Sequence, residues 1–195
     1  MEGFEHVVKV ALEAEGLIVN GNLKFPVKRK TRKTANEEHQ THGYEVDLVG
    51  ARRDKLVLAS VKSFFGSQGV STAGFCGLST KSHPKQERLY AFFNNPEIQQ
   101  GVIEKACERF GYKPNQIELR LYVGKFKGAA QGAAARKAIA SHLANPPDGL
   151  RPVTVLGLDD IVPKLFQLLQ SKTYTNDPVV MTIRALRHAG IIGEL

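Results

Sequence analysis

Two acidic side chains and a lysine stand in two apolar segments of this sequence that are typical of neighbouring strands. Glu45 and Asp47 belong to the segment 44–50, and Lys62 belongs to the segment 56–65. Placing such charges among valine, leucine and phenylalanine costs free energy unless the charges are paired with one another or hold a metal ion. These three residues are therefore the first candidates for chemistry.

The connection between the two segments predicts a hairpin whose turn is Arg53-Asp54. With that turn, Asp47 would stand opposite Ser60, and Glu45 would stand opposite Lys62. The register matters, because a slip of one residue moves every side chain to the opposite face. In this register two carboxylates and an amine converge in the middle of an apolar hairpin. The alternative is a simple Glu45–Lys62 ion pair on a solvated face of an antiparallel sheet.

The two faces of the predicted hairpin follow from the alternation of side chains along a strand. Val46 and Leu48 are expected to share one face, and the two carboxylates are expected to share the other. In the second strand Ser60 and Lys62 share a face, whereas Val61 and its alternate neighbours share the opposite one.

These two strands resemble the hairpin of the PD-(D/E)XK nucleases, which include many restriction endonucleases, Holliday-junction resolvases and the RecB and Mrr groups. The family has an Asp on one strand, then an acidic residue, any residue and Lys on the next. Asp47 and Lys62 match this pattern, whereas Ser60 stands where the family usually has Glu or Asp. The resemblance extends weakly over most of the chain. It implies an α/β fold of the restriction-endonuclease-like type, an α/β/α sandwich with a central mixed β-sheet.

The resemblance implies a metal-dependent endonuclease that hydrolyses DNA phosphodiester bonds in restriction, repair or phage defence. Asp47, together with Glu5 or Glu45 and the main-chain carbonyl of Val61, would hold Mg²⁺, and Mn²⁺ could substitute for it. The ion would polarise the scissile phosphate and lower the pKa of a bound water. Lys62 would position that water and stabilise the developing charge.

Ser60 weakens this expected metal site by one charge, because a hydroxyl offers only a neutral oxygen. Either Glu45 or Glu5 compensates for the missing carboxylate, or the protein cleaves slowly or not at all. The alternative function is therefore a catalytically weakened DNA-binding module, or an interaction subunit of a larger defence or repair complex, that retains the nuclease fold.

The helix expected after the hairpin carries Gln86 and Tyr90, which lie four residues apart and so share a helix face. The pair fits the Gln-x-x-x-Tyr pattern of RecB-like members. The resemblance implies a catalytic role for Gln86 and a DNA contact for Tyr90. The pattern has only two fixed positions, so it adds little weight by itself.

The chain is basic, with a formal net charge of +8 and a pI of about 9.5, which favours a polyanion such as DNA as partner. The charge is concentrated in a run whose basic members are Lys28, Arg29, Lys30, Arg32 and Lys33. A second, looser group comprises Lys125, Lys127, Arg136 and Lys137. We expect the first run to contact the DNA backbone; the alternative is a solvated loop.

Hydrophobic periodicity predicts the elements that position these residues. Helices are expected at 3–15, from 84 to about 110 with a break at 94–96, at 129–143, from 158, and at 178–189. Strands are expected at 17–19, 23–27, 44–50, 56–65, 117–123 and 153–156, with loops at 28–43 and 66–83. This order predicts a mixed sheet with helices on both faces.

Other features narrow the class of protein. Cys76 and Cys107 lack the spacing of a disulfide framework or a zinc site and indicate thiols in a reducing cytoplasm. There is no apolar run long enough for a membrane span, so no membrane partner is expected. We expect one nuclease-like domain over 1–170 and a helical extension over 171–195 that is packed on this domain or appended to it. Because many enzymes of this fold cut two strands by pairing two sites, a homodimer is plausible.

Overall fold

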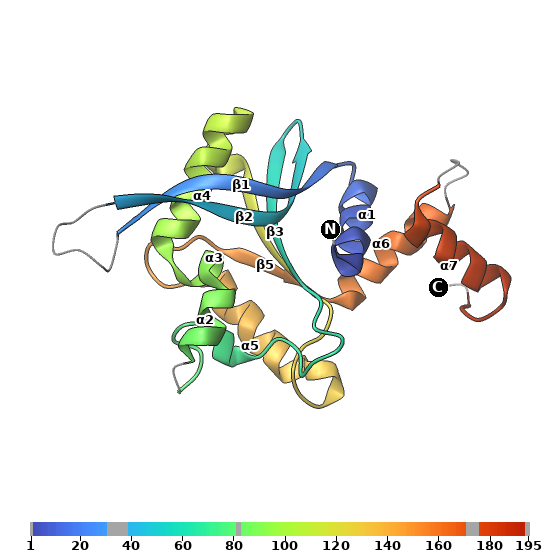
Figure 1. The fold of residues 1–195 in the computed structure, drawn as a ribbon. Helices are drawn as coiled ribbons and strands as arrows, with labels where there is room; N and C mark the ends of the chain where they lie inside the picture. Colours follow the sequence, from blue (N-terminus) through green and yellow to red (C-terminus); the bar gives the residue numbers. More distant parts are fainter. Residues whose placement is uncertain (1, 31–38, 81–82, 171–175, 194–195) are drawn as a thin grey trace.

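A five-stranded mixed β-sheet forms the centre of the structure, a computed structural model that describes residues 2–30, 39–80, 83–170 and 176–193. The strands lie side by side in chain order (Figure 1). They are β1 (Ile18–Lys30), β2 (His39–Arg52), β3 (Lys55–Lys62), β4 (Ile117–Val123) and β5 (Val153–Leu156). β2 is antiparallel to β1 and β3, whereas β3, β4 and β5 run parallel. Helical crossovers make the parallel connections.

The β2–β3 hairpin has the predicted turn. Arg52 pairs with Lys55, which leaves Arg53-Asp54 as the two-residue turn, and the pairing continues to Leu48 opposite Ala59. The register predicted from the sequence is therefore confirmed over these pairs. This register determines which side chains of β3 lie near the point where the β2–β3 pairing stops, at Leu48 and Ala59.

Seven α-helices lie in the part of the chain that the structure describes, and they flank the sheet on both faces (Figure 1). They are α1 (Gly3–Ala14), α2 (Pro84–Leu89), α3 (Ala91–Asn94), α4 (Pro96–Phe110), α5 (Ala133–Ala144), α6 (Leu158–Gln170) and α7 (Pro178–His188). Three short 3₁₀ turns accompany them: η1 (Thr72–Gly74), η2 (Pro114–Gln116) and η3 (Ala130–Gly132).

Two apolar cores separate these helices from the sheet. One core joins alternate side chains of β3 and β4, such as Leu58 and Leu121, to α3, α4 and α5. The other joins Val57, Ala59 and Tyr122 to α1, α6 and α7. Because neighbouring side chains of β3 enter opposite cores, this strand is covered on both sides, as is usual for parallel strands. An α/β fold with a mixed sheet between helices is therefore confirmed.

Local sequence signals explain where α4 begins and ends. The Asn95 side chain accepts a hydrogen bond of 3.1 Å from the Ile98 N–H, and Pro96 occupies the first turn, where its missing N–H leaves no hydrogen bond unmade. At the other end Gly111 adopts a left-handed conformation with a φ of 76°, which glycine accepts without a steric penalty.

The longest departure from the sequence prediction is the β1–β2 hairpin. The segment expected as a loop over 28–43 is strand up to Lys30 and again from His39, and residues 31–38 lie outside the described part. The two short strands expected around Asn20-Gly21 form one strand. The physical reason is the pairing itself, because nearly every residue of β1 has a partner on β2, so polar side chains can be tolerated in a ladder stabilised by backbone hydrogen bonds.

The last helix packs on the main body instead of standing apart. Val180 of α7 is buried in the core with α1 and α6, and His6 of α1 lies 2.8 Å from the Asp177 carboxylate at the start of α7. α7 therefore shares one apolar core with α1 and α6. No helix among the described residues has the length and apolar character needed to cross a membrane.

Candidate functional site

Asp47 lies where β2 and β3 separate. The ladder ends at Leu48 and Ala59, and the next residue, Asp47, makes side-chain contacts to β3 instead. Its Oδ2 accepts hydrogen bonds from the Val61 N–H at 2.6 Å and from the Ser60 hydroxyl at 2.9 Å. The carboxylate thus occupies the place of a ladder acceptor, which fixes its orientation.

The lysine predicted to act with Asp47 lies beside it. The Lys62 Nζ atom is 3.5 Å from Asp47 Oδ2, and the two side chains are 22% and 21% exposed. Both groups are therefore sheltered but open to a ligand. The contacts that the carboxylate makes with the described residues all use Oδ2, and within these residues no hydrogen bond or ion pair engages Oδ1. Asp47 presents one free oxygen next to an amine.

An irregularity in β1 lies directly across from Asp47. Gly21 pairs with Leu48 and Leu23 with Val46, so Asn22 between them faces Asp47. Asn22 has a φ of 56°, the left-handed region that asparagine enters more readily than most residues.

The expectation that Val46 and Leu48 share a face is wrong. Val46 belongs to the core with α3, α4 and α5, whereas Leu48 belongs to the core with α1, α6 and α7. Strict alternation fails at Asp47 and Asn22, which form no pair in the β1–β2 ladder, and Asn22 has a left-handed φ. Asp47 thus lies at the point where alternate side chains of β2 switch from one core to the other.

Glu45 does not reach Lys62 in the structure. Its carboxylate is 3.6 Å from Lys24 Nζ and 3.3 Å from the Asn22 amide nitrogen, both on β1. The partner therefore comes from β1 and not from β3, because β2 and β3 have already separated at this position. The expected Glu45–Lys62 pairing is therefore wrong, and the Glu45 carboxylate contacts β1 instead.

Glu5 is engaged at the start of α1. Its carboxylate accepts a hydrogen bond of 3.0 Å from the Glu2 N–H, as in a capping box. Within the described ranges, no three His, Cys, Asp or Glu side chains converge as metal ligands. The expected union of Asp47 with Glu5 or Glu45 is therefore not present. Val61, expected to offer its carbonyl, contacts Asp47 through its N–H.

Gln86 and Tyr90 lie in different environments, one at the surface and the other in the core. Gln86 is exposed and accepts a hydrogen bond of 3.4 Å from the Ser71 hydroxyl. Tyr90 is only 4% exposed and packs on Phe75, with ring centroids 4.7 Å apart. Burial raises the pKa of the Tyr90 hydroxyl above its ordinary value. A direct DNA contact by Tyr90 is therefore wrong, because the ring is covered by core residues.

The basic run expected to contact DNA is only partly described. Lys28, Arg29 and Lys30 form the end of β1, and the Lys28 side chain is exposed. Arg32 and Lys33 lie outside the described residues. The exposed lysine at the far end of a long hairpin remains compatible with a phosphate contact.

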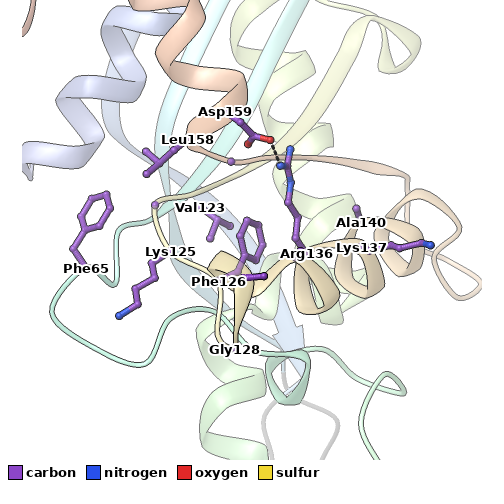
Figure 2. A pocket seen from close by; sticks show the side chains of 14 residues that line it. Phe65, Val123, Lys125, Phe126, Gly128, Arg136, Lys137, Ala140, Leu158 and Asp159 are labelled. Carbon is purple, nitrogen blue, oxygen red and sulfur yellow. Dashed lines mark hydrogen bonds and ion pairs between the residues drawn. The ribbon is translucent and has the colours of Figure 1, made fainter. Parts of the chain in front are cut away.

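A pocket that the sequence did not predict adjoins the site. It has a volume of about 710 Å³ and lies beyond the carboxyl ends of β4 and β5, with α5 along one side (Figure 2). Gly124, which lines it, directly follows β4 and donates its N–H to the Lys62 carbonyl at 2.9 Å. The signal in the sequence was a glycine at a strand end, followed by the second basic group.

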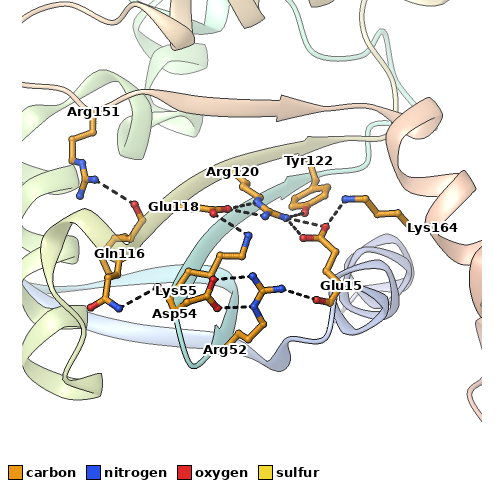
Figure 3. A network of polar contacts seen from close by, with 11 residues as sticks. Glu15, Arg52, Asp54, Lys55, Gln116, Glu118, Arg120, Tyr122, Arg151 and Lys164 are labelled. Carbon is orange, nitrogen blue, oxygen red and sulfur yellow. Dashed lines mark hydrogen bonds and ion pairs between the residues drawn. The ribbon is translucent and has the colours of Figure 1, made fainter.

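A second feature missed from the sequence is an ionic network between β4, α1 and α6 (Figure 3). The Arg120 guanidinium, 9% exposed, contacts Glu118 at 2.7 Å and Glu15 at 2.9 Å. Glu15 also pairs with Lys164, and Arg120 donates to the Tyr122 hydroxyl at 3.0 Å. The sequence signal for this network was the presence of two charged residues, Glu118 and Arg120, inside the apolar segment 117–123.

This network shifts the protonation of its members. Burial alone would raise the pKa of Glu15, but hydrogen bonds and charge from Lys164 and Arg120 outweigh it and lower that pKa. The pKa of Glu118 is also lowered, because hydrogen bonds and charge from Lys55 and Arg120 outweigh the effect of burial. Burial raises the pKa of the Tyr122 hydroxyl to about 12 despite the neighbouring Arg120. The network is paired throughout, which is typical of a structural role.

The oxygen atoms available as metal ligands at Asp47 fit a magnesium ion bound through one protein carboxylate. Mg²⁺ keeps several water ligands and is commonly held by one or two carboxylates together with substrate phosphates. Asp47 Oδ1 meets the first requirement, since the described part of the chain leaves it without a partner.

Comparisons with known proteins leave the function to be argued from this geometry. No protein-family model and no curated protein matches the sequence. The crystal structure of AF1548, a protein of unknown function, aligns with 96% of this chain and 77% of its own, at 11% identity and a TM-score of 0.38. A likeness of this degree carries no functional argument.

Proposed function

We propose that this protein is a metal-dependent endonuclease that hydrolyses DNA phosphodiester bonds at Asp47 and Lys62. The observation that carries the proposal is the Asp47 carboxylate itself. Its Oδ2 atom is fixed by the Val61 N–H and lies 3.5 Å from the Lys62 amine, whereas its Oδ1 atom has no partner among the described residues. The net charge of +8 supports a nucleic acid as substrate.

Each residue of the site has a distinct part in this proposal. The Val61 N–H and the Ser60 hydroxyl hold Oδ2, so that Oδ1 of Asp47 points to a ligand in a fixed orientation. Mg²⁺, when bound there, supplies positive charge to the phosphate and acidifies a bound water. The Lys62 ammonium donates hydrogen bonds to a phosphate oxygen or to the attacking water, and it stabilises the negative charge that develops.

Ser60 sets the expected strength of the site. With one carboxylate in place of two, metal affinity depends more on the phosphate of the substrate. We therefore expect cleavage that needs millimolar Mg²⁺ or Mn²⁺ and is slower than that of enzymes with two acidic ligands.

A plasmid-nicking assay with Mg²⁺ or Mn²⁺ tests the proposal. Wild type is expected to nick supercoiled DNA, and Asp47→Asn, which keeps the size of the side chain, is expected to lose at least about 100-fold in rate, the scale of one lost transition-state contact of this kind. Lys62→Met should lose a similar factor. Lys113→Met, an exposed lysine just before η2, is the matched control. Equal nicking by wild type and Asp47→Asn would contradict the proposal.

A second candidate is a DNA-binding module that has lost cleavage. The observation that favours it is the lack of three converging metal ligands within the described ranges. Salt-dependent binding of duplex DNA without cleavage in any divalent metal would identify this function. An interaction subunit is the third possibility, and assembly with a partner after Asp47→Asn would support it.

A further inference from the structure

The pocket beside Lys62 combines an exposed aromatic face with cationic side chains. Phe65, Lys125, Phe126, Arg136 and Lys137 line it together with the start of α6. We propose that it receives one unpaired nucleotide of the DNA strand bound at the candidate active site. This inference rests on the proposed function, because it names the form of DNA that the same site would take.

The pocket and the candidate active site are connected through the backbone. Val123 pairs with Lys62 across the β3–β4 ladder, and the next residue, Gly124, donates its N–H to the Lys62 carbonyl at 2.9 Å. Neighbouring strands lie about 4.8 Å apart. The backbone of Lys62 thus adjoins the pocket wall at Gly124, and in this proposal a DNA strand bound at Lys62 has its adjoining nucleotide at the pocket.

Phe65 offers the surface on which a base could stack. It is 53% exposed, although one edge is fixed by Phe4 of α1, with ring centroids 5.2 Å apart in a T-shaped arrangement. Phe64 before it has a φ of 48°, a strained conformation that turns the chain out of β3. Gly124 leaves room for the ring, because a Cβ atom there would lie 2.7 Å from Phe65.

Lys125 remains for the phosphate of that nucleotide. Lys125 lies on the same side of the pocket as Phe65 (Figure 2), and its Nζ donates to the Ser67 carbonyl at 2.8 Å, which leaves two of its three N–H donors. Lys137 on α5 lines the far side of the pocket, and its side chain points away from Phe65 (Figure 2). Arg136 is held by Asp159 and Asp160 at the start of α6, so it forms part of the wall.

The connection between β4 and α5 beside the pocket is also built from unusual backbone. Ala130 has a φ of 48°, and Gly128 and Gly132 have φ values of 122° and 73°. A Cβ at Gly132 would lie 2.5 Å from Phe126, the buried floor of the pocket. Asn22, Phe64 and Ala130 are the described non-glycine residues with positive φ. One faces Asp47 and two flank the pocket, and such strain concentrates at functional sites.

These features select an unpaired nucleotide over a paired one. The volume of about 710 Å³ suits a ligand of nucleotide size. An aromatic face binds any base by stacking, and lysines bind the phosphate without reading sequence. A base inside an intact duplex cannot reach Phe65, because both of its faces are already stacked.

Fluorescence anisotropy in EDTA tests this pocket without cleavage. The probes are a fluorescein-labelled duplex with one bulged thymidine, the same duplex fully paired, and unlabelled thymidine monophosphate as competitor. Wild type should bind the bulged duplex about tenfold more tightly than the paired one, the scale of one base stacked on an aromatic ring. Phe65→Ala should abolish this preference and Phe65→Tyr should keep it. Leu89→Ala, an equally exposed apolar residue, is the control.

The other outcomes overturn the inference. Equal binding of the two duplexes by wild type, or an unchanged preference in Phe65→Ala, would exclude an unpaired-nucleotide site. Competition by micromolar thymidine monophosphate would identify a free nucleotide, and not the DNA strand, as the ligand. Failure of the proposed function gives a different pattern, in which the bulge preference depends on Phe65 but neither duplex is cut in Mg²⁺. Lys125→Ala should lower the salt dependence of binding, whereas Lys113→Ala should lower it less.

Discussion

Asp47 is held on one oxygen by two hydrogen-bond donors and one ion pair, and by none of the described residues on the other. The Val61 N–H, the Ser60 hydroxyl and the Lys62 amine all face Oδ2. This asymmetry separates the structural use of the carboxylate from its use for a ligand. It also gives Ser60 a positive role, since a hydroxyl can donate to Asp47 where a second carboxylate would repel it.

Ser60→Asp tests whether the metal binds at Asp47. Two carboxylates at this distance repel each other by on the order of 1 to 4 kcal/mol, so the melting temperature of the variant should fall below that of wild type in EDTA. Added Mg²⁺ should raise it by more than it raises that of wild type, because the ion binds the folded state. Ser60→Ala, which only loses the hydrogen bond, is the control. Equal Mg²⁺ shifts in wild type and Ser60→Asp would place any metal elsewhere.

Among the elements, the β1–β2 hairpin decides how the site is exposed. The two strands pair along nearly their whole length, yet they change faces at Asn22, opposite Asp47. Val46 and Leu48, two residues apart, therefore enter different cores. The change of faces lets β2 separate from β3 at the one position where a carboxylate replaces the ladder.

Substitutions at Asn22 measure the cost of this irregularity. Asn22→Gly should leave the free energy of unfolding nearly unchanged, because glycine accepts positive φ. Asn22→Val should lower it by roughly 1 to 2 kcal/mol, since a β-branched residue is unfavourable there. Urea denaturation provides the measurement. Asn20→Val, at an exposed position of β1 without positive φ, is the matched control and should cost less; equal losses at the two positions would contradict the prediction.

For the whole molecule, two cores and one ionic network join elements that are distant in the sequence. The Arg120 network ties α1 and α6 to the side of the sheet that carries Tyr122. Because its guanidinium is nearly buried, its carboxylate partners must stay ionised to avoid an unpaired charge. The stability of the fold is therefore linked to pH.

The network predicts a loss of stability in acid. The pKa values of Glu15 and Glu118 lie below their ordinary value of 4.5 in the folded protein. The unfolded chain therefore binds more protons, so this stability is fully present above pH 4.5 and is lost as pH falls through the lowered values. Urea midpoints at about pH 7 and pH 3.5 measure the loss.

Glu15→Gln is the control for this pH dependence. The variant should be less stable than wild type at pH 7 by about 1 to 3 kcal/mol, the scale of charged hydrogen bonds. It should also lose less stability between pH 7 and pH 3.5. An identical acid dependence in Glu15→Gln and wild type would show that the network does not control it.

Local signals in the sequence determined the order of helices and strands and the register of the central hairpin. The Arg53-Asp54 turn fixes that register, and Asn95 with Pro96 fixes the start of α4. These features depend on contacts between residues close in the chain, so the sequence displays them directly. The same is true of Asp47 and Lys62, whose proximity follows from the turn.

Only the tertiary structure decided which groups Asp47 meets and which it does not. Glu45 pairs with Lys24 across β1, Glu5 closes the first turn of α1, and Tyr90 is buried. The pocket and the Arg120 network likewise join residues far apart in the chain. Their positions depend on strand twist and on helix packing, which hydrophobic periodicity does not specify. The sequence determined the hairpin, and the packing around it determined that a single free carboxylate oxygen remains there.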